Sequence, residues 1–183
     1  RRSISRLMLA LAKARRPSGP AISLMDILRS MPIIGPDPSC LEADAREVRP
    51  DLPVILVAAI ALIDVDGRIL LAQRPEGKSM AGLWEFPGGK VEDGETPEVA
   101  LIRELHEELD LDISASCLAP LTFASHPYED FHLLMPLYLC RVWKGNPTPK
   151  EGQALKWVRL ENFGDYPMPP ADLPLVAILR DFL

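Results

Sequence analysis

The 183-residue sequence predicts an α+β fold in which sheet-forming and helix-forming segments follow one another in mixed order. Apolar and β-branched runs typical of strands occur over 54–74 and again over 118–160. Helical patterns occur over 96–109 and 171–183. The composition, 48% hydrophobic and 25% charged, is ordinary for a globular domain. The predicted order is therefore sheet, helix, sheet, helix.

The first 50 residues differ from the remainder in charge and composition. They hold nine Lys and Arg and five Asp and Glu, a net charge of +4, whereas 51–183 hold 11 and 21, a net charge of −10. Prolines interrupt 32–51, which predicts a linker. We therefore expect an extension over 1–50, flexible or partly helical, and one domain over 51–183. The basic, acid-free segment 1–16 also resembles a mitochondrial transit peptide, or a short amphipathic helix for a membrane or partner.

The domain begins with two strand-like runs around a turn signal. Segment 54–65 is apolar and ends at Asp66-Gly67, and 68–74 follows with a second strand pattern. Two apolar runs around Asp-Gly predict a β-hairpin. A third short strand is expected at 84–86, and we expect 87–89, Pro-Gly-Gly, to form a turn.

The helix predicted over 96–109 has clear signals at its start. Thr96 can cap it, Pro97 suits its first turn, and Glu98 favours its positive end. The remaining elements are expected to be strands at 118–125, 131–143 and 155–160 and a last helix over 171–183.

Composition narrows the classes of function. The longest apolar run, 52–63, has 12 residues, whereas a bilayer span needs about 20. A domain this acidic lacks the basic face of a nucleic-acid binder, although a metal ion would let it bind phosphates. Cys40, Cys117 and Cys140 are too few and scattered for a disulfide framework or zinc site. We expect reduced thiols in a cytosolic protein.

Three glutamates share one face of the predicted helix over 96–109. Glu104, Glu107 and Glu108 are spaced i, i+3, i+4, which places them within an arc of about 100°. Taken alone, such a face is commonly a solvated surface. However, Mg²⁺ prefers carboxylates, backbone carbonyls and water. Gly88-Gly89 offers a carbonyl before the loop, and Glu95 adds a fourth carboxylate at the start of the helix.

Segment 88–111, GGKVEDGETPEVALIRELHEELDL, resembles a known catalytic motif. Gly89, five residues, Glu95, seven residues and then 103–108, RELHEE, is similar to the Nudix box, GX5EX7REUXEEXGU. Only Asp110 departs from the fixed letters, where the family has Gly, and Asp tolerates the left-handed conformation that ends many helices. Segments 69–92, 150–153 and 169–172 are similar to the MutT branch of the family, which hydrolyses nucleoside triphosphates. The resemblance covers about 54–183.

The resemblance implies a fold, a cofactor and catalytic roles. The fold is a mixed β-sheet between helices, an α/β/α sandwich with a loop–helix–loop catalytic motif. The cofactor is Mg²⁺, with Mn²⁺ as a possible substitute. Its implied ligands are the carbonyl of Gly89 and the carboxylates of Glu104, Glu107, Glu108 and Glu151.

Within the catalytic set, Glu104 matches the general base that activates water for attack on the β-phosphorus. Glu107 and Glu108 belong to the same set. Glu95 is expected to order the loop, and Arg103 to fix a glutamate through a salt bridge.

The resemblance also implies substrate contacts. Arg74 matches a phosphate-contacting arginine, with an exposed charge at the end of a strand as the alternative, and Glu85 is a candidate substrate-binding residue. Trp84, Phe86 and Phe131 are candidate residues of a base pocket, with core packing as the alternative. Asp172 stands where MutT enzymes have asparagine. An ionised carboxylate only accepts hydrogen bonds, so it would favour the N7–H of 8-oxoguanine over the N7 lone pair of guanine. A protonated Asp172 would donate, and the residue can instead cap the last helix.

Taken together, the resemblance implies a Mg²⁺-dependent nucleoside triphosphate pyrophosphohydrolase. The expected reaction is hydrolysis of 8-oxo-dGTP to 8-oxo-dGMP and pyrophosphate, which removes oxidised dGTP from the nucleotide pool and so avoids mutation. The alternatives are a pyrophosphohydrolase of CTP or modified pyrimidine triphosphates, and a non-catalytic nucleotide-sensing module. We expect a monomer or weak dimer without stable nucleic-acid binding, cytoplasmic, or mitochondrial if the basic start is a transit peptide.

Overall fold

The structure, a computed structural model, describes residues 51–183. The extension predicted over 1–50, with its transit-peptide and amphipathic-helix interpretations, lies outside these residues. The described elements are, in chain order, β1 (Val54–Leu62), β2 (Ile69–Gln73), β3 (Trp84–Glu85), β4 (Gly88–Lys90), α3 (Pro97–Leu109), the 3₁₀ helix η2 (Ala115–Cys117), β5 (Ala119–Pro127), β6 (His132–Cys140), β7 (Ala154–Val158), the 3₁₀ helix η3 (Leu160–Asp165) and α4 (Leu173–Phe182).

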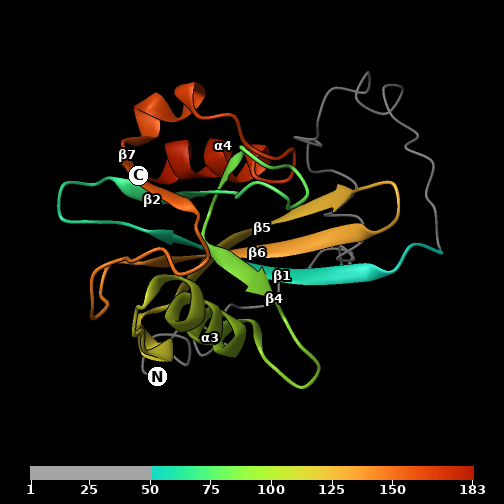
Figure 1. Cartoon of the computed structure of the whole chain (residues 1–183), viewed down its shortest axis with the longest axis horizontal. Coiled ribbons are helices and arrows are strands. Elements are labelled where there is room, and N and C mark those ends of the chain that lie inside the picture. The colour runs from blue at the N-terminus through green and yellow to red at the C-terminus, as the bar shows by residue number, and fades with distance from the viewer. Residues whose placement is uncertain (1–50) are drawn as a thin grey trace, which may run out of the picture. The chain divides into compact units, whose positions relative to one another are not determined.

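The strands form two sheets. A four-stranded sheet has the order β4-β1-β6-β5, and a three-stranded sheet has the order β3-β2-β7. The larger sheet is mixed, because β1 runs parallel to β6 but antiparallel to β4. Helices α3 and α4 lie on opposite sides of this sheet (Figure 1). The predicted α/β/α arrangement is therefore confirmed.

Strand β1 shows why both sides of the sheet need a helix. Its side chains alternate between two hydrophobic clusters, as a strand buried on both faces requires. Ala59 and Ala61 pack in the cluster that contains Leu175, Val176 and Leu179 of α4. The intervening residues of β1 pack in the other cluster, which contains side chains of α3. This cluster joins Ala58, Ile60 and Leu62 of β1 to Leu101, Leu105 and Leu109 of α3.

The hairpin predicted at Asp66-Gly67 is wrong as a strand pairing, although the turn itself is present. The carboxylate of Asp64 accepts hydrogen bonds from the backbone N–H groups of Asp66 and Arg68, at 3.0 and 2.8 Å. Beyond the single bridge between Ile63 and Ile69, β1 and β2 enter different sheets. The reason is that β4 and β6 already occupy both edges of β1.

The turn expected at 87–89 is also wrong, because Gly88–Lys90 forms β4 and pairs with β1. Glycine is what permits this pairing. Gly88 has φ +150°, and a Cβ there would lie 2.1 Å from the carbonyl oxygen of Ala58. A side chain at this position would hold the two backbones apart.

Helix α3 begins and ends as its sequence predicts. Oγ1 of Thr96 accepts a hydrogen bond from the N–H of Val99 at 3.4 Å. Asp110 adopts the left-handed conformation, φ 59° and ψ 37°, and its N–H donates to the carbonyl of His106. The strands after α3 and the last helix form where expected, apart from shifts at their ends. Within 51–183, no helix is both long and apolar enough to cross a bilayer.

Candidate active site

The guanidinium of Arg103 holds three glutamates of α3 and the preceding loop. Its Nε and Nη1 donate to Glu95 and Glu104, both at 2.8 Å, and Nη1 also reaches Glu107 at 3.3 Å. Glu95 further accepts from the N–H of Glu92 at 3.1 Å, so it fastens the loop to the helix. The hydrogen bond from Arg103 lowers the pKa of Glu95 to about 2.

Glu104 is packed directly over the backbone of β4. A Cβ placed on Gly89 would lie 2.1 Å from Cδ of Glu104 and 2.3 Å from its Oε1. The glycine therefore makes the space that this carboxyl group occupies. The carboxyl group of Glu104 therefore lies against the backbone of Gly89, the residue whose carbonyl is the predicted metal ligand.

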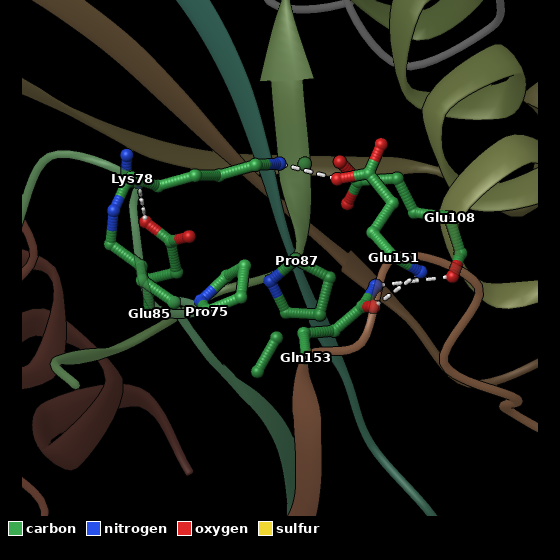
Figure 2. Close-up of a pocket in the computed structure, with 10 residues that line it drawn as sticks. Pro75, Lys78, Glu85, Pro87, Glu108, Glu151 and Gln153 are labelled. Carbon is green, nitrogen blue, oxygen red and sulfur yellow. Dashed lines mark hydrogen bonds and ion pairs between the residues drawn. The ribbon is translucent and has the colours of Figure 1, made fainter. Parts of the chain in front are cut away.

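A charged cavity of about 110 Å³ adjoins these residues. It is lined by cations and carboxylates together, among them Arg74, Lys78, Glu85, Glu108 and Glu151. Figure 2 shows Lys78 extending across the cavity to the carboxylate of Glu151, with which it forms an ion pair. Burial raises the pKa of Glu108 to about 7, and the negative charges of Glu151 and Glu104 add to the effect. The carboxylates therefore lie close enough to repel one another.

Gln153 fixes two of the cavity walls relative to each other. Its Nε2 donates to the backbone carbonyl of Glu108 at 3.1 Å, and its Oε1 accepts from the N–H of Glu151 at 2.8 Å. These hydrogen bonds join the segment before β7 to the last turn of α3 (Figure 2). The position of Glu151 opposite Glu108 is thus set by a buried amide.

A second, more apolar cavity of about 280 Å³ contains Asp172. Aromatic and aliphatic side chains line much of it, including Met80, Tyr128, Phe131 and Leu133. Asp172 is only 4% exposed, and its Oδ1 accepts from the N–H of Phe86 at 3.3 Å. Burial raises the pKa of this carboxyl group to about 7. Although Asp172 is the first residue before α4, its side chain makes no capping hydrogen bond.

Arg74 and Glu85 line both cavities and so form the boundary between them. Nη1 of Arg74 donates to Oε2 of Glu85 at 2.6 Å, and its Nε donates to the carbonyl of Ser79 at 2.6 Å. Burial raises the pKa of Glu85, and the hydrogen bond from Arg74 opposes that shift. A ligand that occupied both cavities would pass this ion pair.

The predicted site residues fall into three places. Arg74 and Glu85 line both cavities, Phe131 and Asp172 line the apolar one, and Glu108 and Glu151 line the charged one. Five more line neither cavity and are joined to one another through the guanidinium of Arg103 and the contact of Glu104 with Gly89; they are Gly89, Glu95, Arg103, Glu104 and Glu107.

Phe86 does not have the position expected of a base-pocket side chain. It is 4% exposed and packs in the core, with its ring centroid 6.1 Å from that of Phe163. Only its backbone N–H reaches the site, through Asp172. Phe86 therefore takes the core position that was the alternative expected for the aromatic residues.

Sequence reasoning did not assign to the site several side chains that line the cavities, among them Lys78, Met80, Tyr128 and Gln153. Lys78 and Met80 lie within the segment 69–92 that carries the family resemblance, but neither belongs to a fixed position of the motif. Their cavity-facing positions depend on how the loop between β2 and β3 folds.

Among residues 51–183, no three His, Cys, Asp or Glu side chains are already gathered into a metal-binding group. The existing ion pairs explain this arrangement. Arg103 holds Glu104 and Glu107, and Lys78 holds Glu151. The predicted ligands nevertheless fit a hard divalent cation, because all of them are oxygen donors. The carboxylates of Glu104, Glu108 and Glu151 also repel one another, and a cation would relieve that repulsion.

A model of the NUDIX domain matches residues 58–177, so the chain belongs to the NUDIX domain family. Its hydrolases generally need a divalent metal ion. The 8-oxo-dGTP diphosphatase of Proteus vulgaris is 43% identical over 96 residues, which cover 52% of this chain and 84% of that protein. The CTP pyrophosphohydrolase of Escherichia coli K12 is also 43% identical, over 118 residues covering 63% and 84%.

A solved structure agrees with these sequence relatives. It is described as MutT from Aliivibrio salmonicida and Vibrio cholerae, and it superposes with a TM-score of 0.60 at 31% identity. The match covers 70% of this chain and 99% of that chain. The predicted family, its MutT-like branch and its fold are therefore confirmed.

Proposed function

We propose that the protein is a Nudix hydrolase that cleaves 8-oxo-dGTP to 8-oxo-dGMP and pyrophosphate, and so removes oxidised dGTP from the nucleotide pool. The observation that carries the proposal is the pair of adjoining cavities, one charged and one apolar, that share Arg74 and Glu85. A nucleoside triphosphate has the same division, with a flat base at one end and a polyphosphate at the other. The name of the Proteus vulgaris relative supports the same substrate.

The apolar cavity suits the base. Its volume of about 280 Å³ is near the lower end of small-molecule sites, which span roughly 300–1,000 Å³. Phe131 and Tyr128 offer aromatic surfaces, with ring centroids 4.9 Å apart. Arg74 at the boundary offers the forked donors that suit phosphate oxygens.

Asp172 supports the choice of an oxidised purine. It is the buried carboxyl group of the apolar cavity, and an ionised carboxylate accepts hydrogen bonds only. 8-Oxoguanine carries a hydrogen on N7, whereas guanine has a lone pair there. The oxidised base would therefore gain a hydrogen bond where the normal base would be repelled. With a pKa of about 7, the acceptor form is a substantial fraction at neutral pH.

Glu104 is the proposed general base. It would take a proton from the water whose oxygen attacks the β-phosphorus. The bond from that phosphorus to the oxygen bridging the α-phosphate breaks, so the nucleoside monophosphate leaves with the bridging oxygen. Arg103, bonded to Glu104 at 2.8 Å, would hold the carboxylate in orientation.

The proposed cofactor is Mg²⁺, with Mn²⁺ as a substitute. The residues that would hold it are the carbonyl of Gly89 and the carboxylates of Glu104, Glu107, Glu108 and Glu151. When bound, the ion polarises phosphate oxygens and lowers the pKa of water. The raised pKa of Glu108 supports this set, because neighbouring carboxylates cause part of it and a cation would relieve their repulsion.

A CTP or modified pyrimidine pyrophosphohydrolase is the second candidate. Cytosine offers an amino donor that Asp172 can accept as readily as the N7–H of 8-oxoguanine. The Escherichia coli relative named CTP pyrophosphohydrolase favours this candidate. A non-catalytic sensing module is a weaker alternative, because the chain retains the carboxylates Glu95, Glu104, Glu107 and Glu108 of the motif. A monomer or weak dimer in the cytoplasm, without stable nucleic-acid binding, stays a prediction.

A kinetic panel separates these candidates. The kcat/KM values of the full chain are measured with 8-oxo-dGTP, dGTP, CTP and 5-methyl-dCTP in the presence of Mg²⁺. The proposal predicts the highest value for 8-oxo-dGTP. A higher value for CTP or 5-methyl-dCTP supports the second candidate instead, and no hydrolysis of any substrate supports the sensing module.

A further inference from the structure

Lys78 is a prominent cation of the charged cavity, and the proposed mechanism does not use it. It lies in the loop between β2 and β3, and its Nζ pairs with Oε2 of Glu151 from the segment before β7 (Figure 2). The pair joins two segments that are 73 residues apart in the sequence. Its partner, Glu151, is one of the proposed metal ligands.

The backbone of this loop is well defined by its own hydrogen bonds. The carbonyl of Arg74 accepts from the N–H of Gly82 at 2.9 Å, and Nε of Arg74 donates to the carbonyl of Ser79 at 2.6 Å. The same loop presents Met80 to the apolar cavity and Lys78 to the charged cavity. The placement of Lys78 therefore belongs to the architecture that shapes both cavities.

The ion pair itself is easily exchanged. The side chains of Lys78 and Glu151 are 50% and 44% exposed, so solvent screens their attraction. Lys78 also shares the cavity with Glu108, so the negative charges of both Glu151 and Glu108 act on its ammonium group. Lys78 thus balances, in the metal-free protein, the same carboxylates that the proposed metal would balance.

We propose that Lys78 is a polyphosphate-binding residue that Glu151 holds until a divalent cation takes this carboxylate. Lys78 is then released to the phosphate oxygens of the substrate in the same cavity. The inference rests on the proposed function for the identity of the site. Its chemical basis is that the carboxylate of Glu151 binds a divalent ion more strongly than it binds the ammonium group of Lys78. The released ammonium group is a compact cation that suits phosphate oxygens.

The first test measures competition for Glu151 in the full chain without nucleotide. Mn²⁺ binding is followed by electron paramagnetic resonance for the wild type and for Lys78→Gln. Loss of an exposed competing ion pair is expected to tighten Mn²⁺ binding about two- to fivefold. The matched control is Lys150→Gln, which removes the same charge from the residue beside Glu151 but from a lysine that pairs with Asp110 at 3.0 Å.

A double variant separates competition from a general charge effect. If Lys78 competes for Glu151, then Lys78→Gln leaves Mn²⁺ binding unchanged when Glu151→Gln is already present. The proposed exchange would be overturned if Lys78→Gln tightened Mn²⁺ binding equally with and without Glu151→Gln. It would also be overturned if Lys150→Gln tightened Mn²⁺ binding as much as Lys78→Gln does.

The second test measures phosphate binding without a base. Tripolyphosphate is titrated into each Mn²⁺-loaded protein and followed calorimetrically. Lys78→Gln is expected to weaken binding about tenfold, the effect of losing one charge-assisted contact, whereas Lys150→Gln has little effect. An unchanged affinity in Lys78→Gln would overturn the proposed role. Because tripolyphosphate has no base, this outcome is independent of whether 8-oxo-dGTP proves to be the preferred substrate.

Discussion

Replacing Asp172 by Asn should stabilise the protein at alkaline pH and leave its stability unchanged in acid. Asp172 is 4% exposed, and burial raises its pKa from the usual 3.8 to about 7. At about 1.36 kcal/mol for each pH unit, this rise corresponds to a destabilisation of about 4 kcal/mol when the buried carboxyl group is ionised. An asparagine of nearly the same shape has no charge to bury, and its amide oxygen can still accept from the N–H of Phe86.

The sign of the pH dependence follows from proton binding. Below pH 3.8 the group is protonated in the folded and unfolded chains, so it contributes no difference. Between pH 3.8 and about 7 only the folded chain keeps the proton, so the wild type loses stability relative to the variant as pH rises. Above about pH 7 the difference is constant.

Urea unfolding of the wild type and Asp172→Asn at several pH values between 4 and 8 measures this difference. The variant is expected to gain up to about 4 kcal/mol relative to the wild type by pH 8, with little difference near pH 4. Equal m-values would show that both proteins unfold by the same transition. A difference that does not change with pH would refute the reasoning, because a steric or hydrogen-bonding effect has no reason to follow this titration.

Three further predictions concern the proposed catalytic residues and the fold. Glu104→Gln should lower kcat by at least about 10²-fold while retaining the unfolding free energy, and unchanged turnover would remove Glu104 as the base. Gly89→Ala should also lower kcat, because its Cβ would lie 2.1 Å from Cδ of Glu104, whereas Gly164→Ala, with no neighbour within 4 Å, should not. Equal kinetics for the two alanine variants would contradict this packing. Tyr138→Phe removes a 2.8 Å hydrogen bond to Glu98, and urea unfolding should show a loss of about 1–2 kcal/mol with unchanged kinetics.

The elements set by local signals were predictable from the sequence. Thr96 and Asp110 mark the ends of α3 because a capping hydroxyl and a left-handed residue act within one helical turn. The glutamates of α3 were also assigned to one face from their spacing alone, and Arg103 does contact Glu104 and Glu107.

Features that depend on distant partners were not predictable. The Asp66-Gly67 turn is local, but the pairing of β1 depends on β4 and β6, which occupy its edges. Glycine is typical of turns, but Gly88 is needed in a strand because the backbone of Ala58 leaves no room for a side chain there. In both cases the sequence signal is genuine, but tertiary contacts decide the structure that it serves.

The site residues were predictable where the motif fixes them, and the prediction was incomplete elsewhere. No local pattern distinguishes Lys78 from a solvated lysine, because its role depends on Glu151, 73 residues away. Asp172 was expected either to read the base or to cap α4. Only the structure shows that its side chain turns to the N–H of Phe86 and makes no cap.

The ratio of kcat/KM for 8-oxo-dGTP to that for dGTP, compared among the wild type, Asp172→Asn and Asp172→Ala, measures base recognition at this carboxyl group. We expect the wild type to prefer 8-oxo-dGTP by about tenfold or more, the effect of one hydrogen bond in a buried site. Asp172→Asn should keep only part of the preference, because its amide oxygen still accepts but its NH2 group can donate to N7 of guanine, and Asp172→Ala should lose it. A wild-type ratio near one, or a ratio that survives in Asp172→Ala, would contradict base recognition by Asp172.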